Sequence, residues 1–261
     1  MNFLRLFLVY LRINVLGELA YRVNFYVQLF QSIVELATAL AGLAVIFSYT
    51  DSLRGWTPDE MLALIGVYFM AGGVIGLVIE PSLEQFITSV REGTLDFTLT
   101  KPEDAQFLVS FQTVNIWKLI DVVMGAAVLG TALVRLGENI GIGQAASFGL
   151  MALAGLVIIY GFWLILATLA FWFVRVENIL VIFQSMYEAG RWPISLYPGW
   201  LRFALTFIVP VAFATTIPVE ALTGRLTLPT LLGAVALAVA LAAISRFFWR
   251  IGLRHYAGAS A

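Results

Sequence analysis

Long apolar runs constrain this chain more than any other feature of its sequence. Hydrophobic residues make up 61% of its 261 residues and charged residues only 12%, whereas a soluble domain carries about 25% charged residues. A helix needs about 20 apolar residues to cross the hydrocarbon core of a bilayer. We therefore expect an all-α integral membrane protein, with spans at 23–48, 61–79, 116–134, 144–173 and 228–249.

The stretch between the last two of these spans allows two interpretations. In the first, 177–189 belongs to a further span, and 197–225 folds back as a re-entrant helical pair broken at Pro210 and Pro218. In the second, 177–189 lies at the membrane surface and 199–217 is the further span. Either interpretation gives six transmembrane helices and places both termini on the same side of the membrane.

Basic residues orient the chain, because they are enriched on the cytoplasmic side of a membrane. With a cytoplasmic N-terminus, the first interpretation places ten of the fifteen Lys and Arg residues inside, and the second places twelve there. Both interpretations put the termini and the polar stretch 81–110 in the cytoplasm. Residues 1–22 carry Arg5, Arg12 and Arg22 among apolar residues. We expect them to form an amphipathic interfacial helix, with a leading extension of the first span as the alternative.

The stretch 81–110 is the longest polar interval of the chain, and its pattern indicates ordered structure. Four apolar residues fall on one face of a short helix, namely Leu83, Phe86, Ile87 and Val90. Gly93 follows as a helix stop. Pro102 can open a second short helix with Glu103 and Asp104 in its first turn, where the helix dipole favours carboxylates. We interpret this stretch as an element that docks a partner.

Ionisable residues inside membrane spans cost free energy, so each one needs a functional or structural explanation. Glu35 lies near the middle of the first span. It is either a substrate or proton site, or a carboxyl that is neutral or hydrogen-bonded against a neighbouring helix. Lys118 and Asp121 are three residues apart on the third span and are expected to pair. Arg175 and Glu177 border the fourth span, where we expect anchoring or local pairing.

Residues for enzyme chemistry are missing from the sequence. The chain has no Cys and one His, His255, so it lacks the usual ligands of a zinc site. Neither of its two lysines, Lys101 and Lys118, follows the glycine frame of a phosphate-binding loop. We therefore expect no catalytic residue, no bound metal or cofactor and no nucleic-acid partner. Energy for uphill transport would come from an ion gradient or from another subunit.

Two motifs resemble a known family of membrane proteins. The phrase REGTLDFTLTKP resembles a segment of ABC-2 type permease sequences, in the family of about 260 residues formerly described only as a domain of unknown function. The matching residues are Arg91, Gly93, Leu95, Asp96, Leu99, Lys101 and Pro102. A second stretch is similar to the late part of the same family through Pro198, Pro210, Pro218 and Gly224. The likeness covers nearly the whole chain as one transmembrane domain, 1–261.

The resemblance implies the transmembrane subunit of an ATP-driven exporter in the bacterial cytoplasmic membrane. Such permeases pair as homodimers or with a sister permease, and each contacts a cytoplasmic ATPase subunit that holds ATP and Mg. Residues 1–22 would be the interfacial helix, 81–110 would hold the coupling helix, and 197–225 would be the re-entrant extracellular helices, which favours the first interpretation. The expected ATPase-docking residues are Arg91, Glu92, Asp96, Phe97, Lys101, Pro102, Glu103, Asp104 and Phe107.

Two other functions compete with an exporter subunit. An ion-coupled secondary transporter would use a membrane-embedded carboxylate, for which Glu35 is the main candidate. Glu35, Lys118 and Asp121 are in either case the polar residues expected near a transport pathway. A non-transporting scaffold subunit would leave the pattern of 81–110 unexplained unless this stretch binds another partner. The sequence indicates at most a hydrophobic or amphipathic cargo.

Overall fold

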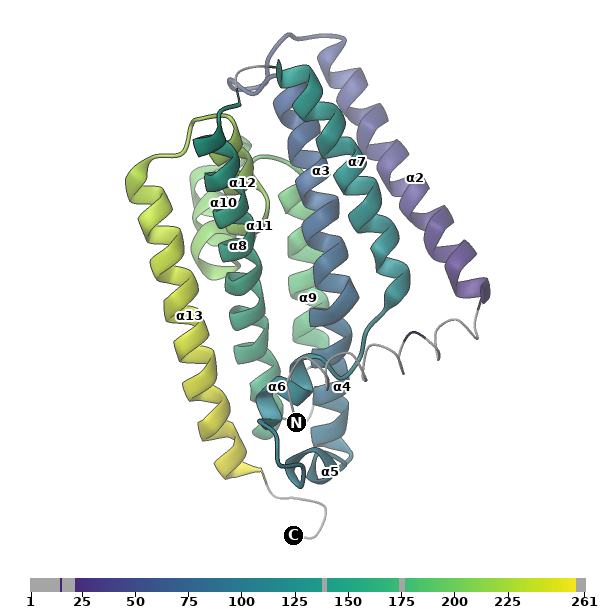
Figure 1. The fold of residues 1–261 in the computed structure, drawn as a ribbon, viewed down its shortest axis with the longest axis vertical. Coiled ribbons are helices and arrows are strands. Elements are labelled where there is room, and N and C mark those ends of the chain that lie inside the picture. The colour runs from purple at the N-terminus through teal and green to yellow at the C-terminus, as the bar shows by residue number, and fades with distance from the viewer. Residues whose placement is uncertain (1–14, 16–21, 138–139, 174–176, 257–261) are drawn as a thin grey trace.

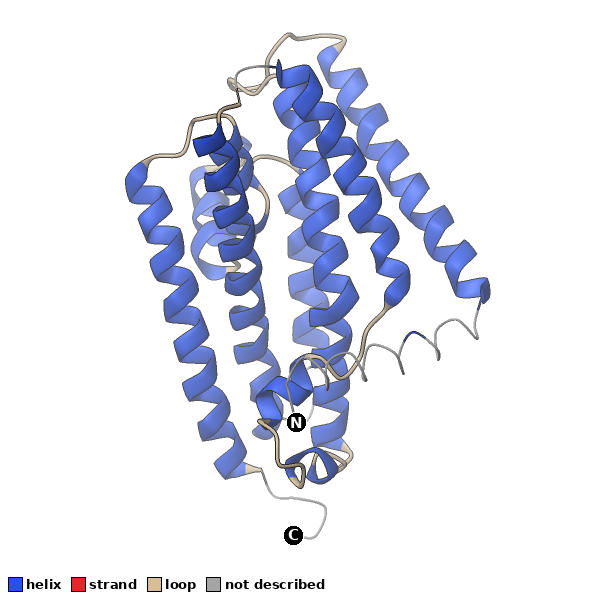
Figure 2. Ribbon diagram, in the orientation of Figure 1, coloured by secondary structure: helices blue, strands red, loops and turns tan. Residues whose placement is uncertain are grey.

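The computed structural model describes residues 15, 22–137, 140–173 and 177–256. Within these ranges the chain forms a bundle of helices joined by loops (Figures 1 and 2). In chain order the helices are α2 (Arg22–Phe47), α3 (Pro58–Val74), η1 (Ile75–Ile79), α4 (Glu80–Arg91), α5 (Asp96–Leu99), α6 (Ala105–Ser110), η2 (Ile116–Lys118), α7 (Leu119–Leu136), α8 (Ile142–Thr168), η4 (Leu169–Phe171), α9 (Glu177–Tyr187), η5 (Glu188–Arg191), η6 (Ile194–Leu196), α10 (Gly199–Phe203), η7 (Ala204–Ile208), α11 (Val211–Ala214), α12 (Thr216–Leu222) and α13 (Leu228–His255).

Five helices are long and apolar enough to cross a membrane, when adjoining short helices are counted with the longer ones. They are Val23–Phe47, Pro58–Arg91, Ile116–Leu136, Ile142–Phe171 and Leu228–His255. These correspond to the five spans that hydropathy predicts, so the all-α membrane class is confirmed. The expected interfacial helix at 1–22 lies almost entirely outside the described residues.

One continuous helix replaces two of the expected elements. A capping box at Thr57 and Glu60 starts α3, and the helix then continues through η1 and α4 to Arg91. The sequence predicts a span that ends near residue 79 and a separate short helix after it. The separation into two helices is wrong: Pro81 has no N–H to donate to the carbonyl of Leu77, but that carbonyl accepts a hydrogen bond from the backbone N–H of Asn115 at 2.9 Å instead, and the helix continues past the proline. The π-helical turn η1 joins the two parts.

Close backbone contact joins α3 to α7. A methyl group on Gly66 would lie 2.6 Å from the backbone nitrogen of Leu129, and one on Gly125 would lie 2.7 Å from the carbonyl oxygen of Gly66. Small residues let helix backbones approach in this way inside a membrane, where apolar burial between helices contributes little. The glycines therefore fix the position of α7 against the central helix of the bundle.

The stretch from α10 to α12 starts and ends at the same end of the bundle. Arg54, in the loop between α2 and α3, donates to the carbonyl of Ser195 at 3.2 Å. Arg225, which follows α12, donates to the carbonyl of Gly55 in the same loop at 2.7 Å. The short helices between these points lie in the half of the bundle away from α5 and α6 (Figure 1). A single span at 199–217 is therefore wrong, because the chain breaks near Pro210 and returns.

Candidate functional site

The stretch 81–110 begins as a firmly packed helix end. Leu83, Phe86 and Ile87 of α4 are buried as predicted, and Val90 is half-buried. The helix ends at Arg91, and Gly93 adopts a φ of 72°, a left-handed conformation that glycine tolerates best. The predicted helix stop is confirmed. Leu95 then turns back into the core and is fully buried.

The residues that follow form two short helices at the end of the bundle. Asp96 opens the single turn α5, and Phe97 within it is 75% exposed. The expectation that Pro102 opens the next helix is wrong. Lys101, Pro102 and Glu103 form a bend, and α6 begins only at residue 105. Asp104 is the N-cap residue, because its carboxylate accepts a hydrogen bond from the backbone N–H of Phe107 at 3.0 Å, and such a cap outweighs a proline start.

An ion pair ties this stretch to the last long helix. The guanidinium of Arg246 on α13 donates to both carboxylate oxygens of Asp104, one of them at 2.9 Å, and to the side-chain oxygen of Gln106 at 2.8 Å. The hydrogen bond from Arg246 holds the pKa of Asp104 below its ordinary value. On α8, Tyr160 shares a 2.6 Å hydrogen bond with Ser110. The stretch is therefore fastened to two separate helices of the bundle.

The nine predicted docking residues do not form one uniform surface. Arg91, Glu92, Phe97, Lys101 and Pro102 are exposed. The remaining four are half-buried, namely Asp96, Glu103, Asp104 and Phe107. The ring of Phe107 packs on Phe111 with 5.1 Å between centroids. The exposed residues are thus the ones available to a partner.

Glu35 on α2 forms an ion pair across the bundle. Its carboxylate accepts a hydrogen bond from the guanidinium of Arg191 on η5 at 2.6 Å. The guanidinium also lies 5.3 Å from the ring centroid of Tyr68 on α3. The Glu35 side chain stays 44% exposed and that of Arg191 25% exposed. Of the two alternatives for Glu35, this pairing matches a carboxyl held by a neighbouring helix.

Lys118 and Asp121 pair as the sequence predicts, with 3.0 Å between the ammonium and a carboxylate oxygen. Asp121 is buried, and it also accepts a hydrogen bond from Ser32 on α2, which in turn accepts one from Gln28 at 3.2 Å. These bonds extend a polar network from α7 to α2. A buried carboxylate with this many partners is adequately satisfied inside an apolar bundle.

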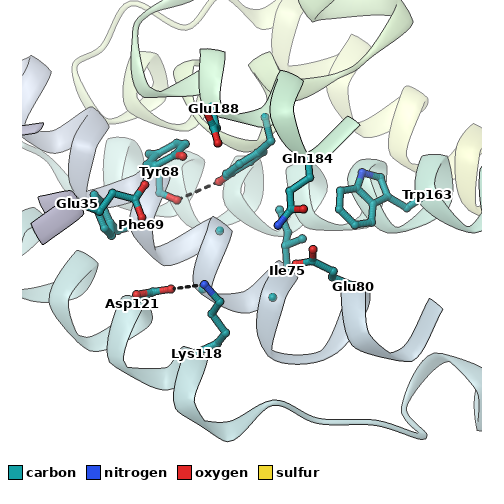
Figure 3. Close-up of a pocket in the computed structure, with 14 residues that line it drawn as sticks. Glu35, Tyr68, Phe69, Ile75, Glu80, Lys118, Asp121, Trp163, Gln184 and Glu188 are labelled. Carbon is teal, nitrogen blue, oxygen red and sulfur yellow. Dashed lines mark hydrogen bonds and ion pairs between the residues drawn. The ribbon is translucent and has the colours of Figure 1, made fainter. Parts of the chain in front are cut away.

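A cavity of about 140 Å³ lies between these two ion pairs. Figure 3 shows side chains from several helices lining it. Besides Glu35, Lys118 and Asp121, its lining includes Tyr68, Glu80, Trp163, Gln184, Tyr187 and Glu188. The rings of Tyr68 and Tyr187 stack with 5.1 Å between centroids, and the Tyr187 hydroxyl donates to the carbonyl of Tyr68 at 2.9 Å.

Sequence reasoning missed most of this lining. Glu80 falls between the predicted span, which ends at residue 79, and the polar stretch 81–110, so the sequence analysis does not single it out. Glu188 and Arg191 lie in the region whose course was open. A stripe on α2 was the one available signal: Asn24, Gln28, Gln31, Glu35 and Thr38 recur at alternating intervals of four and three residues. This spacing places them on one helix face, and one of them, Glu35, lines the cavity.

The remaining candidates add no chemistry to the site. Arg175 lies outside the described residues, as does the side chain of Glu177. His255 is exposed at the end of α13, where its ring lies 5.3 Å from that of Trp172. Among the residues that the structure describes, no group of three or more His, Cys, Asp or Glu side chains could hold a metal ion.

Comparison with known proteins agrees with this architecture. Searches of curated proteins and of solved structures found no match. A family model described as "ABC-2 family transporter protein" matches residues 33–260, which is most of the chain and includes the cavity and the 81–110 stretch. Together with its apolar helices, this match shows that the chain is a multi-pass membrane protein belonging to the ABC-2 transporter family, as a permease component of an ABC transporter.

Proposed function

We propose that the chain is the permease subunit of an ABC exporter, acting as one transmembrane domain. A separate nucleotide-binding subunit would bind ATP and Mg and hydrolyse the ATP, and the permease would move a hydrophobic or amphipathic substrate outward. One observation carries this proposal: a single helix, Pro58–Arg91, joins the polar cavity at Tyr68 and Glu80 to the exposed 81–110 stretch. A signal received at one end can therefore reach the other through one continuous helix.

The surface for the ATPase would be the tip formed by α5 and its flanks. Phe97 is a large apolar side chain left 75% exposed, and charged residues surround it in the sequence. An aromatic anchor with a polar rim is the usual composition of an interface centre. This placement puts the tip and both termini in the cytoplasm, and it puts the α10–α12 segment on the extracellular side as a re-entrant pair. The α9 helix would then supply the sixth span.

A second permease subunit would cover the face that carries Glu35. An ion pair whose side chains are 44% and 25% exposed would be costly against lipid tails. The stripe on α2 adds further polar groups to the same helix. A second copy, or a sister permease, that packs here would shield these groups and enclose a polar route between two subunits. Lipid would cover the other apolar faces.

The ion pair also bears on the competing function. A carboxylate that binds transported protons must lose and gain its proton during each cycle, whereas Glu35 is held by Arg191 at 2.6 Å. This pairing favours the ATP-driven exporter over an ion-coupled transporter that uses Glu35.

Co-purification tests the proposal. The tagged permease is extracted gently from native membranes as wild type, as Phe97→Asp and as Tyr49→Asp. Tyr49 is a matched control, because it is an aromatic residue, 87% exposed, in the loop at the opposite end of the bundle. We expect an ATPase with a phosphate-binding loop to accompany wild type and Tyr49→Asp but not Phe97→Asp. Absence of any such ATPase from wild type would refute the exporter, and its retention by Phe97→Asp would refute the docking surface.

A further inference from the structure

The charges around the cavity do not balance. Four carboxylates line it, and two of them are paired: Glu35 with Arg191, and Asp121 with Lys118. Within the described part of the chain, Glu80 and Glu188 have no ion-pair partner. The cavity therefore has two more carboxyl groups than ion-paired cations, one half-buried at Glu80 and one exposed at Glu188.

Aromatic rings form much of the remaining wall. Tyr68 and Tyr187 stack on one side, and Trp163 lies near Glu80 (Figure 3). Carboxylates next to aromatic faces suit an organic cation, because the ring faces carry negative charge and attract ammonium groups. The protein already uses this combination once at the edge of the cavity, where the Arg191 guanidinium meets both Glu35 and the ring of Tyr68.

Other ligand classes fit the cavity less well. An anion would meet Glu80 and Glu188, while the ammonium of Lys118 is already engaged by Asp121 at 3.0 Å. A divalent metal needs a compact group of oxygen ligands, and no such group occurs among the described residues. A volume of about 140 Å³ is close to that of an engineered cavity of about 150 Å³ that holds one benzene molecule. This space suits a small head group rather than a large ring system.

We propose that the cavity binds the ammonium head group of an amphipathic substrate. The proposal rests on the permease function and adds the chemical class of the cargo. Glu80 and Glu188 would neutralise the positive charge, and the rings of Tyr68, Trp163 and Tyr187 would surround it. The apolar tail would extend out of the cavity along the bundle.

A binding measurement on the purified permease tests this assignment. The protein is held in uncharged maltoside micelles and titrated with hexyltrimethylammonium and, separately, with hexanesulfonate, with binding followed by calorimetry. The two probes share a chain length and differ in charge. The variants are Glu80→Gln and Glu188→Gln. Glu220→Gln is the matched control, because Glu220 is a half-buried carboxylate on α12 that does not line the cavity.

We expect saturable binding of the ammonium probe at least tenfold tighter than that of the sulfonate. Each cavity variant should weaken ammonium binding by roughly three- to tenfold, the size of one Coulombic contact between a carboxylate and a cation in solvent-exposed surroundings, and Glu220→Gln should bind like wild type. All variants must elute and unfold like wild type to count. Equal or tighter sulfonate binding, no saturable ammonium binding, or variants that bind like wild type would each overturn the inference.

This result is separable from the permease proposal. Recovery of the ATPase does not depend on Glu80 or Glu188, which lie away from the exposed tip. If the ATPase co-purifies while the ammonium probe does not bind, only the cargo class is refuted. If the probe binds but no ATPase is found, the exporter fails while the cation site stands.

Discussion

Replacing Gly125 by Ala tests the close contact between α3 and α7. The new methyl group would lie 2.6 Å from the backbone nitrogen of Met70 and 2.7 Å from the carbonyl oxygen of Gly66. Both are backbone atoms, so no side chain can rotate away, and the helices must separate. Gly130 on the same helix offers a matched control, because a methyl group there meets no atom within 4 Å.

The size of the effect follows from comparing the two variants. Both replace a helical glycine by Ala, which favours a helix by about 1 kcal/mol, and this gain cancels in the difference between them. What remains is the cost of overpacking at Gly125, about 1–3 kcal/mol. For a chain of this size, 1 kcal/mol changes the unfolding temperature by about 2–4 °C. Gly125→Ala should therefore unfold roughly 2–12 °C below Gly130→Ala.

Thermal unfolding in maltoside micelles, followed by intrinsic fluorescence, measures this difference. We expect Gly125→Ala to unfold below wild type or close to it, and Gly130→Ala to match or exceed wild type. The informative quantity is the order of the two variants. If Gly125→Ala proved as stable as Gly130→Ala, the backbones of α3 and α7 could not be in the contact described, and the position of α7 would need revision.

Two ion pairs at the ends of the bundle give further expectations. Arg225→Ala leaves the buried carboxylate of Glu60 without its cation, which lies 2.7 Å away, and should lower the free energy of unfolding by about 3 kcal/mol. Arg135→Ala removes only a 3.9 Å contact with Asp59 from a side chain that is 62% exposed, and should cost under about 1 kcal/mol. The unfolding temperatures of both variants at neutral pH measure this difference. Arg246 lowers the pKa of Asp104 below its ordinary value of 3.8. The ion pair therefore stabilises the folded state fully at pH values above 3.8, and this stabilisation is lost as the pH falls through the lowered pKa of the folded state. The stability difference between wild type and Asp104→Asn, measured from pH 7 to pH 3, should therefore stay constant at first and shrink only below about pH 4, and a loss near pH 6 would contradict the assignment.

The sequence predicted correctly those features that depend on interactions between residues close together in the chain. The apolar runs, the helix stop at Gly93 and the pair Lys118–Asp121 all depend on residues close in the chain. The pair Glu35–Arg191 joins residues 156 positions apart, so only the packing of α2 against η5 brings it together. Hydropathy likewise ended the second span at residue 79, because it cannot distinguish the end of a membrane from the end of a helix.

The same distinction between local and long-range contacts explains why the exposed tip could be predicted from the sequence and the cavity could not. The tip is one contiguous stretch, so its candidate residues can be found by reading along the chain. The start of α6 differs from the prediction because Asp104 is a stronger helix start than Pro102. The cavity is built from a few residues on each of several helices that are far apart in the sequence. Glu80 and Glu188 line one cavity only after the helices have packed, and no spacing along the chain reports that.

The helix Pro58–Arg91 also has a mechanical consequence. At 1.5 Å per residue, its 34 residues span about 50 Å, whereas the hydrocarbon core is about 30 Å thick. Under the proposed function, the helix would therefore act as a lever, because it is longer than the hydrocarbon core is thick. Its irregular turn, η1, lies beside the cavity through Ile75 and Gly76. The part of the helix beyond this turn, α4, is about 18 Å long, so a tilt of about 10° at the turn would move the tip by about 3 Å. Conversely, a push on the tip would bend the helix where it lines the cavity.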